Sequence, residues 1–90
     1  MLKVVLSNQF KKDLKLAQKR GLDIDLLTEI VDKIASGEEL PPKNRDHNLS
    51  GVYADFRECH IQPDWLLIYK IEENDLMLFL YRTGSHSDLF

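Results

Sequence analysis

The spacing of apolar residues predicts a strand and then a helix at the start of the chain. Residues 2–6 (LKVVL) form a short run rich in β-branched side chains, which is typical of a strand. Residues 8–20 follow Ser7, a residue type that caps helix N-termini, and precede Gly21, a residue type that ends helices. Apolar residues recur at helical spacing on one face of this segment: Phe10, Leu14 and Ala17. We therefore expect a strand followed by an amphipathic helix.

A second amphipathic helix is predicted from Asp23 to about Ser36. Asp23 can cap its N-terminus, and Gly37 can end it. Its apolar stripe consists of Leu27, Ile30, Val31 and Ile34. Because only a few residues separate the two helices, we expect them to form an antiparallel hairpin.

The second half of the chain predicts a loop and three strands. Two consecutive prolines cannot continue a helix, so residues 41–51, which include His47, are expected to be an extended loop. Residues 52–60 alternate between polar and apolar side chains, as a half-buried strand does. Residues 65–71 and 76–82 are apolar runs on either side of a short polar turn. Residues 83–90 are expected to be a loop.

These elements predict an α+β domain with the order β-α-α-β-β-β. The helical hairpin should pack on one face of a mainly antiparallel, four-stranded twisted sheet. Residues 1–90 contain no repeat, low-complexity tract or linker, so we expect a single domain. No apolar run approaches the roughly 20 residues of a membrane helix, and the N-terminal apolar stretch is too short for a secretory signal. With Cys59 as the only cysteine, an intramolecular disulfide is excluded, and we expect a reduced, cytoplasmic setting.

Charge is distributed unevenly along the chain. Residues 1–21 contain six basic residues and one acidic residue, a local charge of +5, whereas residues 22–40 contain one basic and six acidic residues, a local charge of −5. The first predicted helix carries five basic residues, of which the four lysines follow i, i+3, i+4 spacing: Lys11, Lys12, Lys15, Lys19 and Arg20. The folded chain can therefore have a basic face despite its net charge of −3. That net charge argues against direct DNA binding by the chain alone.

No common cofactor or metal signature occurs in the sequence. Glycine-rich phosphate loops, paired CxxC motifs and HExxH are absent, and the spacings between the three histidines match no common zinc pattern. The strand position of Cys59 favours a core thiol over a nucleophile. We therefore expect neither a metal nor a cofactor.

Polar residues that suit metal-independent RNA cleavage occur near the predicted ends of the last three strands. They are His47, Arg57, Glu58, His60, Asp64, Trp65, Arg82, Ser85 and His86. Such cleavage needs a base for the 2′-hydroxyl proton, an acid for the departing 5′-oxygen and a cation for the charged phosphorane. Each residue also has an ordinary structural role, such as surface histidine, cross-strand ion pair or core tryptophan, so the residues alone leave both interpretations open.

Three segments carry a resemblance to a known family. They are residues 46–51 (DHNLSG), 56–70 (FRECHIQPDWLLIYK) and 82–90 (RTGSHSDLF). Together they closely resemble the YafQ-type toxins of the RelE/ParE superfamily, which belong to bacterial type II toxin–antitoxin systems. Residues 11–21 also resemble the first helix of that family. The resemblance implies a small α+β toxin that cleaves mRNA in the A site of the 70S ribosome and is neutralised by a cognate antitoxin.

The resemblance also implies roles for individual residues. The family's catalytic set corresponds to His47, His60, Asp64 and His86, and its RNA-binding helpers correspond to Arg57, Trp65, Arg82 and Phe90. On this basis His86 is the expected general acid, either Asp64 or His47 the base or its orienting group, and His60 with Arg57 the phosphate-binding pair. The basic first helix is then expected to contact 16S rRNA. Glu58 departs from the family pattern, because the type member has an aspartate there.

Two other functions are considered. A gyrase-inhibiting toxin of the ParE branch shares the fold and binds a protein without nuclease activity, but it has no chemical use for the histidines and Asp64. A non-catalytic toxin kept as a repressor subunit is expected to have lost a catalytic position, and none is lost here.

Overall fold

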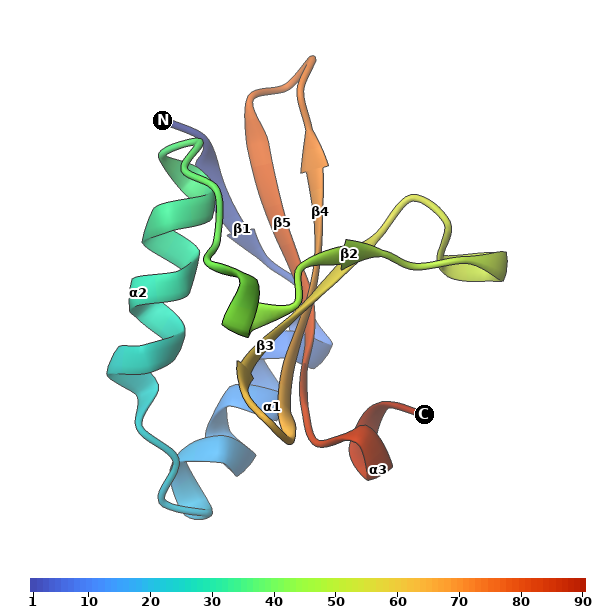
Figure 1. The fold of residues 1–90 in the computed structure, drawn as a ribbon. Helices are drawn as coiled ribbons and strands as arrows, with labels where there is room; N and C mark the ends of the chain where they lie inside the picture. The colour runs from blue at the N-terminus through green and yellow to red at the C-terminus, as the bar shows by residue number, and fades with distance from the viewer.

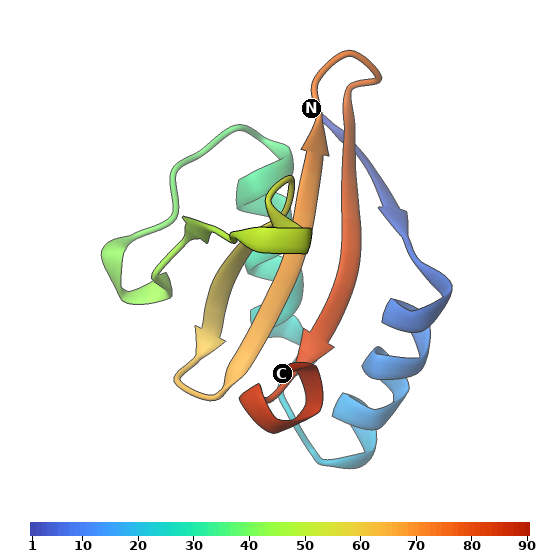
Figure 2. The same cartoon turned by 90° about the vertical axis from the view of Figure 1, so that its right-hand side faces the viewer.

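The computed structural model describes residues 1–90. The elements are β1 (Lys3–Leu6), α1 (Asn8–Lys19), α2 (Ile24–Ala35), the 3₁₀ turn η1 (Pro42–Asn44), β2 (His47–Asn48), the 3₁₀ turn η2 (Gly51–Tyr53), β3 (Arg57–Gln62), β4 (Trp65–Glu72), β5 (Met77–Gly84) and α3 (His86–Leu89) (Figure 1). The sheet has the order β1-β5-β4-β3-β2, with β1 parallel to β5 and every other neighbouring pair antiparallel. Helices α1 and α2 lie on one side of this sheet, and η2 and α3 lie on the other (Figure 2).

The two predicted helices form where their capping residues indicate. The Ser7 hydroxyl accepts a hydrogen bond from the backbone N–H of Phe10 at 2.9 Å, and the Asp23 carboxylate accepts one from Asp25 at 3.0 Å. After each helix, a glycine adopts the left-handed conformation that terminates the hydrogen-bond ladder: Gly21 at φ 77° and Gly37 at φ 81°. The two predicted helices and their boundaries are therefore confirmed to within one residue.

The core lies between the helices and one face of the sheet. Phe10 and Ala17 of α1 and Leu27 of α2 pack in one cluster with buried side chains of β3, β4 and β5. Burying each large apolar side chain contributes about 1.5–3 kcal/mol, so this layer supplies most of the driving force for folding. No helix is long and apolar enough to cross a membrane.

The structure corrects the sequence prediction in three places. Residues 47–48, predicted as loop, form the short strand β2, so the sheet has five strands instead of four. The strand predicted over residues 52–60 starts later: residues 51–53 form a 3₁₀ turn that begins at Gly51, which has φ 66°, and β3 begins only at Arg57. The tail, predicted as loop, extends β5 to Gly84 and ends in α3, because Ser85 and Asp88 form a reciprocal capping box.

The sheet face opposite the helices carries a second, smaller apolar group. It consists of the rings of Tyr53, Phe56, Phe79 and Tyr81, of which Phe56 and Tyr81 are closest, with centroids 4.8 Å apart. The Lys70 ammonium lies 5.8 Å from the centre of the Phe56 ring. This half-buried group holds η2 against the sheet, next to the end where the candidate site lies.

Candidate active site

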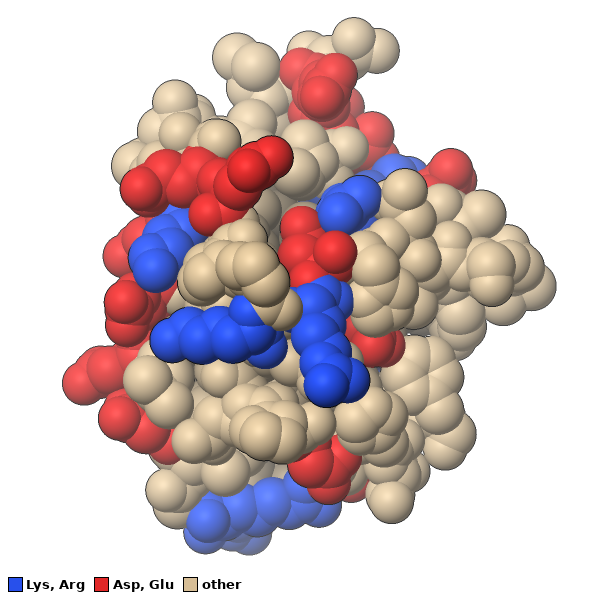
Figure 3. All heavy atoms as spheres, in the orientation of Figure 1, with Lys and Arg blue, Asp and Glu red and all other residues tan.

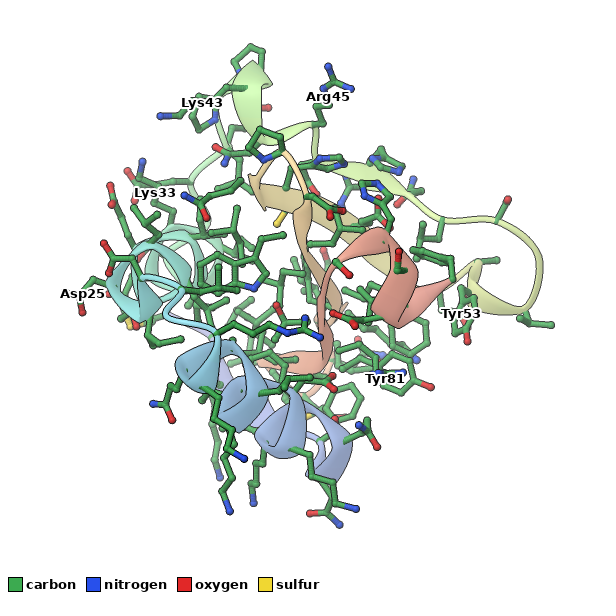
Figure 4. All side chains as sticks on the ribbon, turned by 90° about the horizontal axis from the view of Figure 1, so that it is seen from below. Asp25, Lys33, Lys43, Arg45, Tyr53 and Tyr81 are labelled. Atoms are coloured by element: carbon green, nitrogen blue, oxygen red, sulfur yellow. The ribbon has the colours of Figure 1, made fainter.

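The three histidines converge where β2, β3 and α3 meet. His60 lies on β3, His47 lies on β2 beside it, and His86 is the first residue of α3. The rings of His60 and His86 are edge to face, with centroids 5.6 Å apart. Figure 4 views the molecule from below, with α3 in the middle and the η1–β2 segment at the upper edge.

Asp64 holds His86 by two hydrogen bonds. Its Oδ1 atom lies 2.6 Å from His86 Nδ1 and also accepts the backbone N–H of His86 at 3.0 Å. The backbone hydrogen bond first, and the imidazole second, lower the pKa of Asp64, so its carboxylate is ionised at neutral pH. Because Nδ1 donates to this carboxylate, Nε2 is the ring atom of His86 that can exchange a proton with a substrate.

A buried carboxylate lies between the other two histidines. Glu58 is only 6% exposed, and its Oε1 atom lies 3.7 Å from Nε2 of both His47 and His60. The strand geometry explains this arrangement, because Glu58 and His60 are two residues apart on β3 and His47 is the cross-strand partner of Glu58. When either histidine is protonated to the imidazolium form, electrostatic attraction to Glu58 therefore holds its ring in place.

Two loop residues fix the positions of His47 and His60. The carbonyl oxygen of Arg45 lies 2.7 Å from His47 Nδ1, which must be the donor because a carbonyl oxygen only accepts. His47 Nε2, which faces Glu58 Oε1 at 3.7 Å, is thus the ring nitrogen that makes no hydrogen bond within the protein. The Asn44 side chain, 3% exposed, donates to the carbonyl oxygen of His60 at 2.7 Å and ties η1 to β3.

Arg57, which was expected to bind phosphate, is hydrogen-bonded to the segment that carries His47. Its guanidinium donates to both carboxylate oxygens of Asp46 at 3.2 Å and to Asn48 Oδ1 at 2.6 Å. The Tyr69 hydroxyl donates to the same Asp46 at 2.5 Å. The bond to Asp46 raises the pKa of Arg57, and burial first, then Asp46, raise the pKa of Tyr69. In this arrangement Arg57 positions β2.

The remaining expected RNA-binding residues differ in accessibility. Arg82 donates from two nitrogens to the buried Asp13 of α1, at 2.8 and 3.3 Å, and so joins α1 to β5. Trp65 is 2% exposed and donates to Thr83 Oγ1 at 2.9 Å, which makes it a core residue. The expectation that Trp65 helps to bind RNA is corrected here, because a buried indole offers no face to a base. Phe90, by contrast, is 65% exposed at the end of α3.

The basic residues of α1 divide into two groups. Lys11, Lys12, Lys15 and Lys19 are exposed. Helix α1 lies across the molecule from η1 and Arg45, so the lysines and the histidines are on different faces (Figure 4). Arg20 instead forms a bidentate pair with Asp88 of α3, at 2.6 and 3.2 Å. That pair lowers the pKa of Asp88 well below its usual range and anchors α3.

The described residues offer no arrangement suited to metal-dependent or thiol-based catalysis. No group of three or more His, Cys, Asp or Glu side chains is arranged to hold a metal ion. Burial raises the pKa of Cys59 to about 12, so the thiolate needed for nucleophilic attack is absent at neutral pH. The cavity between α1 and β5 is lined by Asp13, Arg20, Arg82 and Asp88, whose charges are already paired.

Sequence reasoning did not assign roles to several residues that build the site. Asp46, Asn44 and the carbonyl group of Arg45 position histidines, and Glu58 connects two of them. Only the position of Glu58 could have been inferred, because residues two apart on a strand share a face. The other contacts depend on how the loop folds back on β3.

Comparison with known proteins gives consistent results. The sequence profile described as "Bacterial toxin of type II toxin-antitoxin system, YafQ" matches residues 2–90. The mRNA interferase toxin YafQ of Escherichia coli is 41% identical over 85 residues, which cover 93% of this chain and 90% of that protein. The crystal structure of a metal-bound toxin from Helicobacter pylori has a TM-score of 0.95 at 49% identity, with both chains covered completely. The toxin in the E. coli DinJ-YafQ toxin-antitoxin complex has a TM-score of 0.88 at 39% identity, covering 99% of this chain and 97% of that one.

Proposed function

The chain belongs to the YafQ family of toxins of bacterial type II toxin–antitoxin systems, and on that premise we propose that it is an endoribonuclease that cleaves mRNA in the ribosomal A site and so inhibits translation. The observation that carries this proposal is the Asp64–His86 pair beside His60. An imidazole held by a carboxylate and placed next to a second imidazole is suited to general acid–base catalysis.

His86 serves as the general acid in this proposal. Asp64 stabilises the protonated imidazole through Nδ1–H, and Nε2–H protonates the 5′-oxygen as the bond between phosphorus and that oxygen breaks. The 2′-oxygen attacks the same phosphorus, which yields a 2′,3′-cyclic phosphate and a 5′-hydroxyl. Because Asp64 is occupied by His86, the role of base falls to His47, whose free Nε2 accepts the 2′-hydroxyl proton. Glu58 then stabilises the resulting imidazolium, and His60 faces the phosphate.

The ribosome contact is assigned to the lysines of α1. Lys11, Lys12, Lys15 and Lys19 are exposed and have no carboxylate partner within 4.0 Å. Such a row neutralises phosphates of 16S rRNA without sequence specificity, and its binding weakens as salt rises. Its separation from the histidines would allow the protein to hold rRNA with one face and cut mRNA with another.

A cognate antitoxin is the second proposed partner. The related E. coli toxin is described in a complex with DinJ, and that structure superposes over nearly the whole of this chain. A partner that covers the histidines or the lysine row would block, respectively, the chemistry or the access to the ribosome.

Cleavage of a defined mRNA by the purified chain, with and without ribosomes, tests the proposal. We expect cleavage only with ribosomes, at positions within the A site. Cutting of naked RNA alone would keep the chemistry and remove the ribosome as an obligatory partner. Growth arrest without any cutting, together with inhibition of supercoiling by purified gyrase, would replace the proposal by the ParE-type function.

A further inference from the structure

Arg45 differs from the other arginines of the chain in having no acidic partner. Three of the four arginines form ion pairs with carboxylates: Arg20 with Asp88, Arg57 with Asp46 and Arg82 with Asp13. Arg45 is exposed and has no carboxylate oxygen within 4.0 Å, and the same holds for Lys43 two residues before it. These two cations are therefore free to bind an anion from outside.

Both cations border a hollow that His60 and His86 also border. The hollow has a volume of about 590 Å³, and its walls include Lys43, Arg45, His60, Gln62 and His86. Figure 4 shows Lys43 and Arg45 on the η1–β2 segment at the edge of this end of the molecule. Basic side chains lie near the middle of the face seen in Figure 3, next to a few acidic ones, and further acidic side chains lie along the α2 margin. An RNA strand whose phosphate reaches His60 and His86 thus passes these cations.

The backbone around Arg45 is held firmly relative to the histidines. Arg45 has φ 47° and ψ 44°, a left-handed conformation that residues with a side chain adopt infrequently. Its N–H donates to the Pro42 carbonyl oxygen at 3.1 Å, and its own carbonyl oxygen accepts from His47. The preceding residue, Asn44, is bonded to the backbone of His60. Arg45 therefore orients His47 through its carbonyl group, and the same held backbone carries its unpaired guanidinium at the edge of the hollow.

We propose that Arg45, assisted by Lys43, binds a phosphate of the RNA strand adjacent to the scissile one. This assignment rests on the proposed ribonuclease function and adds to it the residues that bind the RNA backbone. A guanidinium matches two phosphate oxygens at once, and Lys43 adds a point charge. Neither side chain takes part in proton transfer, so their contribution is to affinity.

The test measures affinity and rate separately in Arg45→Gln, Lys43→Gln and the double variant. Binding is followed by fluorescence anisotropy of a short single-stranded oligonucleotide with 2′-deoxy sugars, which cannot be cleaved. We expect Arg45→Gln to weaken binding about tenfold at low salt, as the loss of a charge-assisted hydrogen bond does. The slope of log affinity against log salt should fall by about 0.7 for each cation removed. Arg45→Lys should recover part of the loss.

Single-turnover cleavage of mRNA bound to ribosomes gives the second readout. In Arg45→Gln the toxin concentration for half-maximal rate should rise about tenfold, while the maximal rate changes less than about twofold. Lys3→Gln is the matched control, because Lys3 pairs with Met77 at the far end of β5, about 23 Å from Gly84 at strand spacing. Thermal unfolding of each variant verifies that the fold is intact.

Three results would overturn the assignment. The first is unchanged affinity in both Arg45→Gln and the double variant, and the second is an equal loss of affinity in Lys3→Gln. The third is a fall in maximal rate with unchanged affinity, which would mean that Arg45 acts only by positioning His47. If the wild-type chain cleaves no RNA, the ribonuclease proposal fails, and the anisotropy measurement still decides whether Arg45 binds a nucleic-acid phosphate.

Discussion

At the scale of single residues, the site depends on which hydrogen-bond partner each charged group has. Asp64 is exposed, yet it accepts two hydrogen bonds from one residue and so determines which nitrogen of His86 carries the exchangeable proton. Arg57 and Arg82 were expected to be phosphate ligands, but each is paired with a carboxylate inside the structure. A charged residue near a catalytic motif is therefore available to a substrate only when the fold leaves it without a partner.

Asp64→Asn tests the assignment of Asp64 as the group that orients His86. The asparagine oxygen can still accept a hydrogen bond, but it no longer stabilises the protonated imidazole. We expect cleavage to fall by about 10²-fold with unchanged thermal stability, in line with the loss of general acid catalysis. The exposed turn residue Asp75 provides a control, and a rate for Asp64→Asn equal to that of Asp75→Asn would refute the assignment.

Trp65→Phe distinguishes a core tryptophan from one that stacks on RNA. The substitution removes the hydrogen bond to Thr83 and leaves a cavity, so the free energy of unfolding should fall by about 1–3 kcal/mol. Urea unfolding measures this loss. Affinity for the oligonucleotide should be preserved in the folded variant; weaker binding with full stability would restore the stacking role.

At the scale of elements, the short pieces at the rim of the sheet place the functional groups. Helix α3 has four residues, too few to be stable alone, and it is held by its capping box and by Arg20 of α1. Strand β2 has only two residues and is held by β3 and by the Asp46–Arg57 pair. These two elements carry His86 and His47, so their anchoring contacts are also contacts on which catalysis depends.

Asp88→Asn should weaken the anchoring of α3 in a pH-dependent way. Arg20 holds the folded-state pKa of Asp88 below its ordinary value of 3.8. The unfolded state therefore binds the proton more readily, and the carboxylate stabilises the fold above pH 3.8 and loses this contribution as pH falls towards the lowered pKa. The variant should unfold at a lower temperature than the wild type at pH 7, and the gap should close in acid. A gap that is constant with pH would contradict the role of the ion pair.

The long elements were predicted from the sequence, and the short ones were not. The helices follow from apolar spacing and from Ser7 and Asp23, because these signals are local. The spacing of Ser85 and Asp88 was a local signal for α3 that the prediction did not use. By contrast, β2 and the η1 contacts form only through tertiary pairing with β3. The four catalytic candidates were identified from the family resemblance. The role of Arg45 could be inferred only from the structure, which shows that its carbonyl group orients His47 and that its side chain has no acidic partner.

At the scale of the whole molecule, positive charge occurs on two separate surfaces. The exposed lysines of α1 lie across the molecule from Lys43 and Arg45, while α2 carries acidic side chains along the margin between them (Figures 3 and 4). With a net charge of −3, long-range attraction to RNA is weak, so binding depends on these local surfaces. One of them faces the proposed catalytic centre, and the other is assigned to rRNA.

Lys12→Glu combined with Lys15→Glu tests the second surface. Both side chains are exposed, so the fold should be unchanged, whereas binding to ribosomes should weaken strongly and its salt dependence should become shallower. Co-sedimentation with ribosomes at several salt concentrations measures the effect. Lys3→Glu serves as a charge-reversal control on β1, and equal binding by the double variant and the wild type would remove the lysine row from the interface.

The central claim is that His86, oriented by Asp64, protonates the departing 5′-oxygen of RNA. It is tested most directly by single-turnover cleavage with wild-type protein and His86→Ala, both shown to be folded by circular dichroism, on mRNA bound to ribosomes. We predict a loss of roughly 10²–10⁴-fold in rate in the variant, the range of a general acid, with little change in thermal stability. Cleavage by His86→Ala at the wild-type rate would contradict the assignment and move the chemistry to another group.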